Sequence, residues 1–217
     1  MNGKTFAVIL SGCGHQDGAE IHEATMTLWA IHKAGCEYRC FAPDIPQRHV
    51  LNHITGNELP EQRNVLIESA RIARGQIADL ADFSSDNIDG LVIPGGFGAA
   101  KNLCSYAFDG AECTVNKDVA DAVLAMHEAA KPIGALCIAP VILARLLEQP
   151  KLTIGDNADV AQHIEEMGGT HIITRPEEIV IDSSQNIVTT ACYMFDARVD
   201  QIARSADKVI QAMLELM

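Results

Sequence analysis

A cysteine between an apolar run and a helical pattern is the best candidate for chemistry in this chain. Cys137 follows the apolar residues 132–136 and precedes a helical pattern over residues 139–147. Ala135 and Ala139 stand where a nucleophile elbow usually has glycines, because such a sharp turn has little room for side chains. The positive end of the following helix is expected to lower the pKa of the thiol. The spacing predicts a nucleophilic thiol; the alternative is a buried structural cysteine.

Two backbone amides are candidates for stabilising the negative charge that develops on an attacked carbonyl oxygen. The amide of Ile138 opens the helix after Cys137, and the amide of Gly96 lies in the loop 94–98, which follows a short buried strand. Because glycine has no side chain, this loop lets its backbone come close to a substrate. The sequence predicts an oxyanion site made by these two amides, although the loop alone is also explained as a tight connection.

Acidic side chains and a histidine gather after the first predicted strand. Residues 11–18 form a glycine-rich loop that contains His15, and Glu20 and Glu23 follow in the first turns of a helix. A partly buried carboxyl group there would have a raised pKa and could exchange protons with a thiol or a substrate. The simpler interpretation is that the two glutamates only complement the helix dipole. For His15 three interpretations stay open: a base, a substrate contact or an ordinary loop residue.

Strands alternate with helices along the whole chain, which is typical of an α/β fold with a largely parallel sheet covered on both faces. We predict strands at residues 5–10, 38–42, 91–93, 132–136, 152–154, 179–181 and 187–190. We predict helices from the first loop to about residue 35 and at residues 64–80, 116–130, 139–147, 159–167 and 198–216. Ligands of such sheets bind at the carboxyl ends of the strands, where the candidate residues should meet. No linker interrupts the pattern, so we expect a single domain over residues 1–217.

Composition excludes several classes of function. A formal net charge of −13 opposes binding to nucleic acids and to anionic membrane surfaces. No apolar stretch approaches the roughly 18 residues of a membrane span, and residues 1–10 do not resemble an export or transit signal, so a cytoplasmic location is expected. Seven cysteines without a C-x-x-C pair indicate reduced thiols and no zinc site. Nucleotide-binding glycine motifs are also missing, and no cofactor is expected.

Three motifs together resemble the ThiJ/PfpI superfamily, which has the class I glutamine amidotransferase-like fold. They are residues 18–23, 93–96 and 135–140, in the order typical of that superfamily. Within it the chain looks most similar to the glyoxalase-like ElbB branch, also called the enhancing lycopene biosynthesis or sigma cross-reacting protein branch. The resemblance implies a flavodoxin-like three-layer sandwich, a homodimer, and a glutamate of the first helix that touches the elbow sulfur. Glu23 is the matching position, and Glu20 is the second candidate because the longer loop before it could shift the register.

The chain departs from its relatives in its histidines. Peptidase-like relatives have a histidine where Ile138 stands, and others have one near residues 154–156, so peptide cleavage is not expected. His163 begins a His-x-Glu sequence like that of glutamine amidotransferases, but it stands only 26 residues after Cys137 on a predicted helix, and we interpret the match as chance. His171 is a weaker candidate.

The resemblance and the residues together predict a glutathione-independent glyoxalase. Cys137 would add to a small dicarbonyl such as glyoxal, Glu23 would move protons, and glycolate would be released at a low rate; deglycation of proteins is a variant. One alternative is a redox-sensing or accessory protein of isoprenoid metabolism or stress, in which Cys137 is oxidised and catalysis is vestigial. Another is an amidotransferase-like subunit that supplies ammonia and depends on His163.

Overall fold

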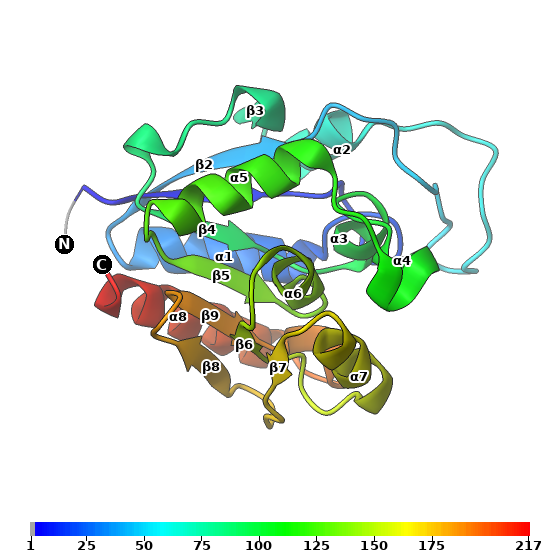
Figure 1. Cartoon of the computed structure of the whole chain (residues 1–217). Helices are drawn as coiled ribbons and strands as arrows, with labels where there is room; N and C mark the ends of the chain where they lie inside the picture. The colour runs from blue at the N-terminus through cyan, green and yellow to red at the C-terminus, as the bar shows by residue number, and fades with distance from the viewer. Residues whose placement is uncertain (1–2) are drawn as a thin grey trace.

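Seven strands form one sheet in the order β3-β2-β1-β4-β5-β9-β8 in the computed structural model, which describes residues 3–217 (Figure 1). The strands are β1 (Thr5–Ile9), β2 (Glu37–Ala42), β3 (Ile77–Asp79), β4 (Gly90–Ile93), β5 (Ile133–Leu136), β8 (Ile179–Asp182) and β9 (Ile187–Thr190). All neighbouring pairs are parallel except β8 and β9, which are antiparallel. The central strands β4 and β5 are buried along their whole length, as expected where helices cover both faces of a parallel sheet.

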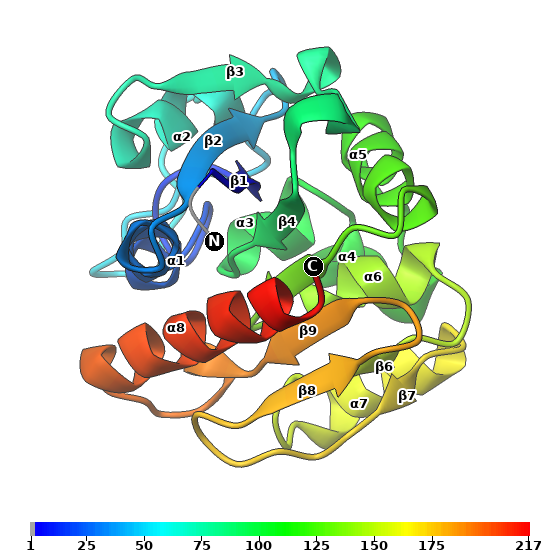
Figure 2. The same cartoon turned by 90° about the vertical axis from the view of Figure 1, so that its left-hand side faces the viewer.

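Helices cover the two faces of the sheet, and side chains of each strand point alternately to one face and the other. One face carries α1 (Ile21–Lys33), α2 (Val65–Ile72) and α8 (Val199–Glu215), and the other carries α3 (Phe97–Lys101), α5 (Lys117–Glu128) and α6 (Pro140–Leu146). In β1, Phe6 and Val8 pack on the α1 and α8 side, whereas Ala7 and Ile9 pack on the α5 and α6 side. Figure 2 shows α8 on one side of the sheet and α5 on the other. The predicted three-layer sandwich is confirmed.

Smaller elements connect the strands and helices of the sandwich. They are α4 (Tyr106–Asp109), α7 (Ala158–Glu166), the two-stranded parallel sheet of β6 (Lys151–Leu152) and β7 (Thr170–His171), and the 3-10 turns Leu80–Asp82, Ser85–Asn87, Gly110–Glu112 and Cys192–Met194. Among residues 3–217, no helix combines the length and the apolar character that crossing a membrane requires. Met1 and Asn2, which belong to the stretch considered as a leader, lie outside the described residues.

Two sequence predictions differ from the structure. The helix predicted at residues 64–80 ends at Ile72, because the backbone turns left-handed at Arg74 (φ 53°) and Gly75 (φ 80°) and then continues as β3. The strand predicted at residues 152–154 does not join the main sheet. Its first residue pairs with β7 instead, while the place beside β5 is taken by β9. The short helices α3 and α4 were not predicted, since each is a single turn with little periodicity.

Candidate active site

The loops after β1 and β4 meet through direct contacts between their backbones. Gly98 N donates to Gly18 O at 2.8 Å, and Glu20 N donates to Gly95 O at 2.9 Å. A Cβ atom added at Gly98 would lie 2.5 Å from the backbone of Gly18, and one added at Gly96 would meet the Glu20 nitrogen. The glycines therefore let the loop that precedes α1 lie directly on the loop 94–98. This contact fixes the start of α1 beside the end of β5.

Cys137 stands at the turn between β5 and α6. Its φ is 59°, a left-handed conformation that a residue with a side chain rarely adopts, and its amide donates to Thr190 O of β9 at 2.8 Å. Ala135 and Ala139 are fully buried, so the turn leaves no space for larger side chains there. Pro140 begins α6, a position that needs no N–H donor. The result is a strained turn, held by its neighbours, with a thiol that is only 7% exposed.

Glu23 contacts the thiol, and of the two glutamates considered it is the one that does so. Its side chain is fully buried beneath the loop 94–98. Oε2 accepts a hydrogen bond from Gly95 N at 2.9 Å, and Oε1 accepts one from Tyr193 N at 3.2 Å. Because two backbone amides hold the carboxyl group, it has a fixed position beside the sulfur of Cys137.

The protonation of this pair differs from the sequence prediction. Burial, and next the charge of Glu20, raise the pKa of Glu23 to about 8. Burial, and next the charge of Glu23, raise the pKa of Cys137 well above its ordinary value, although hydrogen bonds from the amides of Gly96 and Ile138 act in the opposite direction. The expected lowering by the helix dipole is therefore wrong, because the thiol is buried against a carboxyl group. At neutral pH, Glu23 largely retains its proton and can donate it.

A second group of polar side chains lies at the start of α1. Glu20 caps this helix, since its Oε2 accepts from Glu23 N at 2.7 Å. His22 Nδ1 lies 2.8 Å from the hydroxyl oxygen of Tyr193 and 3.9 Å from Glu20 Oε1. Sequence reasoning did not select Tyr193 or His22. Tyr193 could have been found, because it stands three residues after the end of the strand predicted at residues 187–190, near the carboxyl edge where ligands bind.

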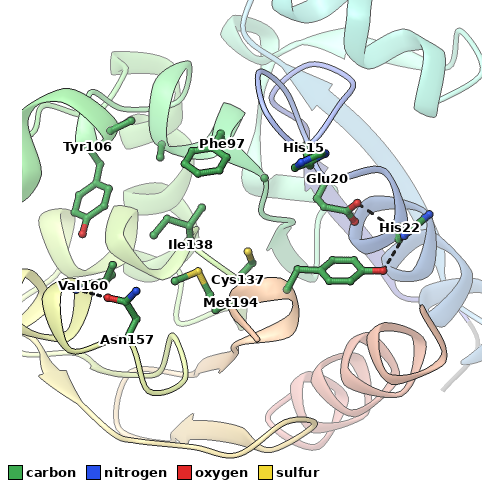
Figure 3. Close-up of a pocket in the computed structure, with 14 residues that line it drawn as sticks. His15, Glu20, His22, Phe97, Tyr106, Cys137, Ile138, Asn157, Val160 and Met194 are labelled. Carbon is green, nitrogen blue, oxygen red and sulfur yellow. Dashed lines mark hydrogen bonds and ion pairs between the residues drawn. The ribbon is translucent and has the colours of Figure 1, made fainter. Parts of the chain in front are cut away.

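A cavity of about 670 Å³ opens above the thiol (Figure 3). It is lined by His15, Glu20, His22, Gly96, Phe97, Ala100, Tyr106, Ala107, Cys137, Ile138, Asn157, Val160, Tyr193 and Met194. In Figure 3, Cys137 lies between a polar side, with Glu20 and His22, and an apolar side that extends to Tyr106 and Val160. The sequence candidates Cys137, Glu20, His15, Gly96 and Ile138 therefore share one cavity, and Glu23 lies beneath it.

Two other histidines considered from the sequence do not line this cavity. His163 Nδ1 is 2.9 Å from the hydroxyl oxygen of Tyr106, and His171 Nε2 accepts from Ile154 N at 3.4 Å. Across residues 3–217, no three side chains of the metal-binding types gather closely enough to hold an ion. The seven cysteines, all of which fall within this range, are free thiols.

Known proteins resemble the chain over nearly its whole length. It is 43% identical over 97% of its residues to the human "Glutamine amidotransferase-like class 1 domain-containing protein 3, mitochondrial", of which it covers 82%. It is 41% identical over 97% of its residues to the "ES1 protein homolog, mitochondrial" of Rattus norvegicus, of which it covers 83%. No family model matches the sequence.

Solved structures share the fold. A crystal structure of an "isoprenoid biosynthesis protein with amidotransferase-like domain" from Ehrlichia chaffeensis is similar with a TM-score of 0.91 and 35% identity, over 98% of this chain and 100% of the other. Drosophila melanogaster DJ-1beta has a TM-score of 0.58 and 18% identity over 100% and 96% of the two chains. A ThiJ/PfpI domain protein from Brachyspira murdochii has a TM-score of 0.59 and 14% identity over 100% and 99%. At these low identities the last two show the fold alone.

The names of the curated relatives contradict one sequence prediction. The human and rat proteins are named mitochondrial, and so is the "ES1 protein, mitochondrial" of Danio rerio, which is 32% identical over 88% of this chain and 77% covered by it. The predicted cytoplasmic location is therefore wrong by this comparison. It rested on the lack of a leader pattern in residues 1–10, and that lack carries no information about where a protein resides.

Proposed function

The chain belongs to the family of glutamine amidotransferase-like class 1 domain proteins, with the ThiJ/PfpI and DJ-1 fold, and we propose that it is a glyoxalase that converts glyoxal into glycolate without glutathione. The observation that carries the proposal is the contact between the Cys137 thiol and the buried carboxyl group of Glu23. A nucleophile beside an acid whose pKa of about 8 lies near the operating pH suits a reaction that consists of proton transfers.

The first step joins Cys137 to the substrate. Glu23, when ionised, takes the proton of the Cys137 thiol, the resulting thiolate attacks one aldehyde carbon of glyoxal, and the electron pair of the carbonyl bond moves to its oxygen. This oxygen then takes the proton back from Glu23 to give a hemithioacetal. The amides of Gly96 and Ile138 point at the sulfur and so lie beside the place where the oxyanion forms. Support for this role is the position of the two amides beside the sulfur, and the oxyanion site stays a prediction.

The next steps move a hydrogen between the two carbons. The Glu23 carboxylate removes the proton from the carbon that carries the sulfur, and the hydroxyl proton of the hemithioacetal passes to the oxygen of the neighbouring carbonyl group, so that the electrons of the broken C–H bond form the double bond of an enediolate. Glu23 returns its proton to the neighbouring carbon, and the sulfur-bearing carbon becomes the carbonyl of a thioester. Water then attacks the thioester, the carbon–sulfur bond breaks, and glycolate leaves; one proton of the water returns to the sulfur of Cys137 and the other passes to solvent. The overall reaction adds one water to glyoxal, and no electron acceptor is needed.

The two alternative functions have less support. A redox sensor needs a thiol that ionises readily, whereas burial and Glu23 raise the pKa of Cys137. A glutaminase needs a histidine that protonates the departing ammonia, whereas His163 is bonded to Tyr106 at 2.9 Å and does not line the cavity. The Glu23 contact favours aldehyde chemistry, in which no amine departs.

The test is glycolate formation from glyoxal by the purified protein without glutathione. We expect many turnovers per protein, none above background for Cys137→Ala, and a loss of about 100-fold or more for Glu23→Gln. Cys36→Ala is the matched control, because it removes a buried thiol that lies outside the cavity. Turnover that is the same without Cys137, or no turnover by the folded wild type, would contradict the proposal.

A further inference from the structure

The cavity above Cys137 is much larger than glyoxal needs. Its volume of about 670 Å³ falls within the range of roughly 300–1,000 Å³ in which proteins bind ligands of drug size. Glyoxal consists only of two joined aldehyde groups and would fill a small part of this space. If the proposed function holds, most of the cavity must serve another portion of the substrate or remain filled with water.

The walls of the unused part are apolar. On the side away from Glu20 and His22, the lining comes from α3, α4, α7, the elbow and the turn Cys192–Met194, with the side chains Phe97, Ala100, Tyr106, Ala107, Ile138, Val160 and Met194. In Figure 3 the labelled side chains Phe97, Ile138, Tyr106 and Val160 lie on one side of Cys137, with Phe97 and Ile138 nearer the thiol than Tyr106 and Val160. Water molecules form few hydrogen bonds with such walls, whereas burying an apolar group against them is favourable by about 0.8 kcal/mol of free energy for each methylene.

The polar side suits the oxygen-bearing end of a substrate. His22 and Tyr193 are joined at 2.8 Å, and the largely buried Glu20 lies near them. At the far end of the apolar side, Asn157 Oδ1 accepts from Val160 N at 3.0 Å, and the amide keeps its Nδ2 donor and a second lone pair on Oδ1 for other contacts. The cavity can therefore hold the carbonyl oxygens of a substrate on one side of Cys137 and an apolar chain of the same substrate on the other.

We propose that the substrate is a 2-oxoaldehyde, R–CO–CHO, in which R is an apolar chain longer than a methyl group. This inference rests on the proposed function and names its substrate class. The thiolate adds to the aldehyde carbon, the ketone oxygen faces His22 and Tyr193, and R lies against Ile138, Tyr106 and Val160. The same proton transfers give the 2-hydroxy acid R–CH(OH)–COOH after one water is added, with no change in overall oxidation state.

The first experiment measures kcat/KM for glyoxal, methylglyoxal and 2-oxohexanal with the purified protein. Each buried methylene corresponds to about a fourfold gain, so kcat/KM should rise at least about tenfold from methylglyoxal to 2-oxohexanal even with incomplete burial. If glyoxal is turned over in a Cys137-dependent way and kcat/KM is flat or falls with chain length, the inference is overturned and the proposed function stands. If none of the three is turned over, both fail.

The second experiment fills the apolar side. Val160→Phe places a ring where R is proposed to lie, and the preference for 2-oxohexanal over glyoxal, as a ratio of kcat/KM values, should fall at least about fivefold. Val199→Phe is the matched control, since Val199 is 45% exposed on α8 and does not line the cavity. Val160→Ala serves if Val160→Phe does not fold, and it should weaken the preference by removing wall contacts. An unchanged preference in a folded Val160 variant would overturn the inference.

Discussion

A buried carboxyl group that keeps its proton makes the stability of the fold depend on pH. Burial and Glu20 raise the pKa of Glu23 from 4.5 to about 8, which corresponds to about 5 kcal/mol at most. An acid whose pKa is higher in the folded state stabilises the fold fully below pH 4.5. That contribution is lost as the pH rises through the folded-state value of about 8.

Glu23→Gln should therefore remove part of the pH dependence of stability. Between pH 5.5 and pH 8.5, the free energy of unfolding of the wild type should fall by several kcal/mol more than that of Glu23→Gln, because the amide has no charge to bury. Urea denaturation at the two pH values measures this difference. The exposed Glu128→Gln should behave like the wild type, and parallel pH profiles for all three proteins would contradict the prediction.

Gly95 lies in the loop 94–98, which covers the two reacting side chains, and its backbone approaches both of them closely. A Cβ atom there would lie 2.7 Å from Glu23 Oε2 and closer still to Cys137 Cβ. Gly95→Ala should therefore cost roughly 1–3 kcal/mol in the free energy of unfolding and abolish turnover, because the thiol and the carboxyl group must move apart. Thermal unfolding and glycolate formation check this. Gly56→Ala, which has nothing within 4 Å, should leave turnover unchanged; if Gly95→Ala also does so, the close contact is not required.

At the scale of elements, the start of α1 couples the stability of a helix to the chemistry of the site. Glu20 supplies the N-cap, and its charge is the largest influence after burial on the pKa of Glu23. The two roles can be separated, because glutamine keeps a carbonyl oxygen as a cap but carries no charge.

Glu20→Gln should lower the pKa of Glu23 with little change in stability, whereas Glu20→Ala should also lose about 1 kcal/mol of stability because the cap is gone. The pH profile of kcat/KM for glyoxal measures the first effect, and the limb assigned to Glu23 should move to lower pH in both variants. Denaturation at one pH measures the second. A limb that stays in place in both variants would show that Glu20 does not act on Glu23 through its charge.

The sequence predicted the bounds of helices best where a helical apolar pattern continues over the whole segment. Helices α5, α6, α7 and α8 lie within about two residues of their predicted bounds, and the burial of β1 and β5 follows from their apolar runs. The turn after Ile72 was missed because residues 64–80 keep an apolar pattern through the left-handed Arg74 and Gly75. In the site, Cys137 and its small neighbours carry a local signal. The place of Tyr193 near the carboxyl edge could be predicted, but the hydrogen bond from its amide to Glu23 is a tertiary contact that spacing does not reveal.

The whole molecule carries a net charge of −13, and its like charges repel one another in the folded state. Raising NaCl from about 10 mM to about 150 mM shortens the screening length from roughly 30 Å to roughly 8 Å. The melting temperature should therefore rise by roughly 2–4 °C, which is about 1 kcal/mol for a chain of this size. Scanning calorimetry measures the shift, and the same rise in KCl would exclude binding of sodium. A melting temperature that falls with salt would show that surface ion pairs dominate instead.

The homodimer expected from the sequence also concerns the whole molecule, and it stays a prediction.

The glycine contacts between the loops after β1 and β4 decide where this site can be redesigned. Any side chain at Gly96 or Gly98 would meet backbone atoms of the opposite loop, and one at Gly18 would meet the backbone of Gly12 and Cys13 in its own loop; backbone atoms cannot rotate away as a side chain can. Libraries that randomise these positions would therefore consist almost wholly of misfolded proteins. The wall formed by Ala107 and Val160 stands on separate short helices, at positions that are not enclosed by backbone. Directed evolution toward new aldehydes should vary that wall and leave the glycines unchanged.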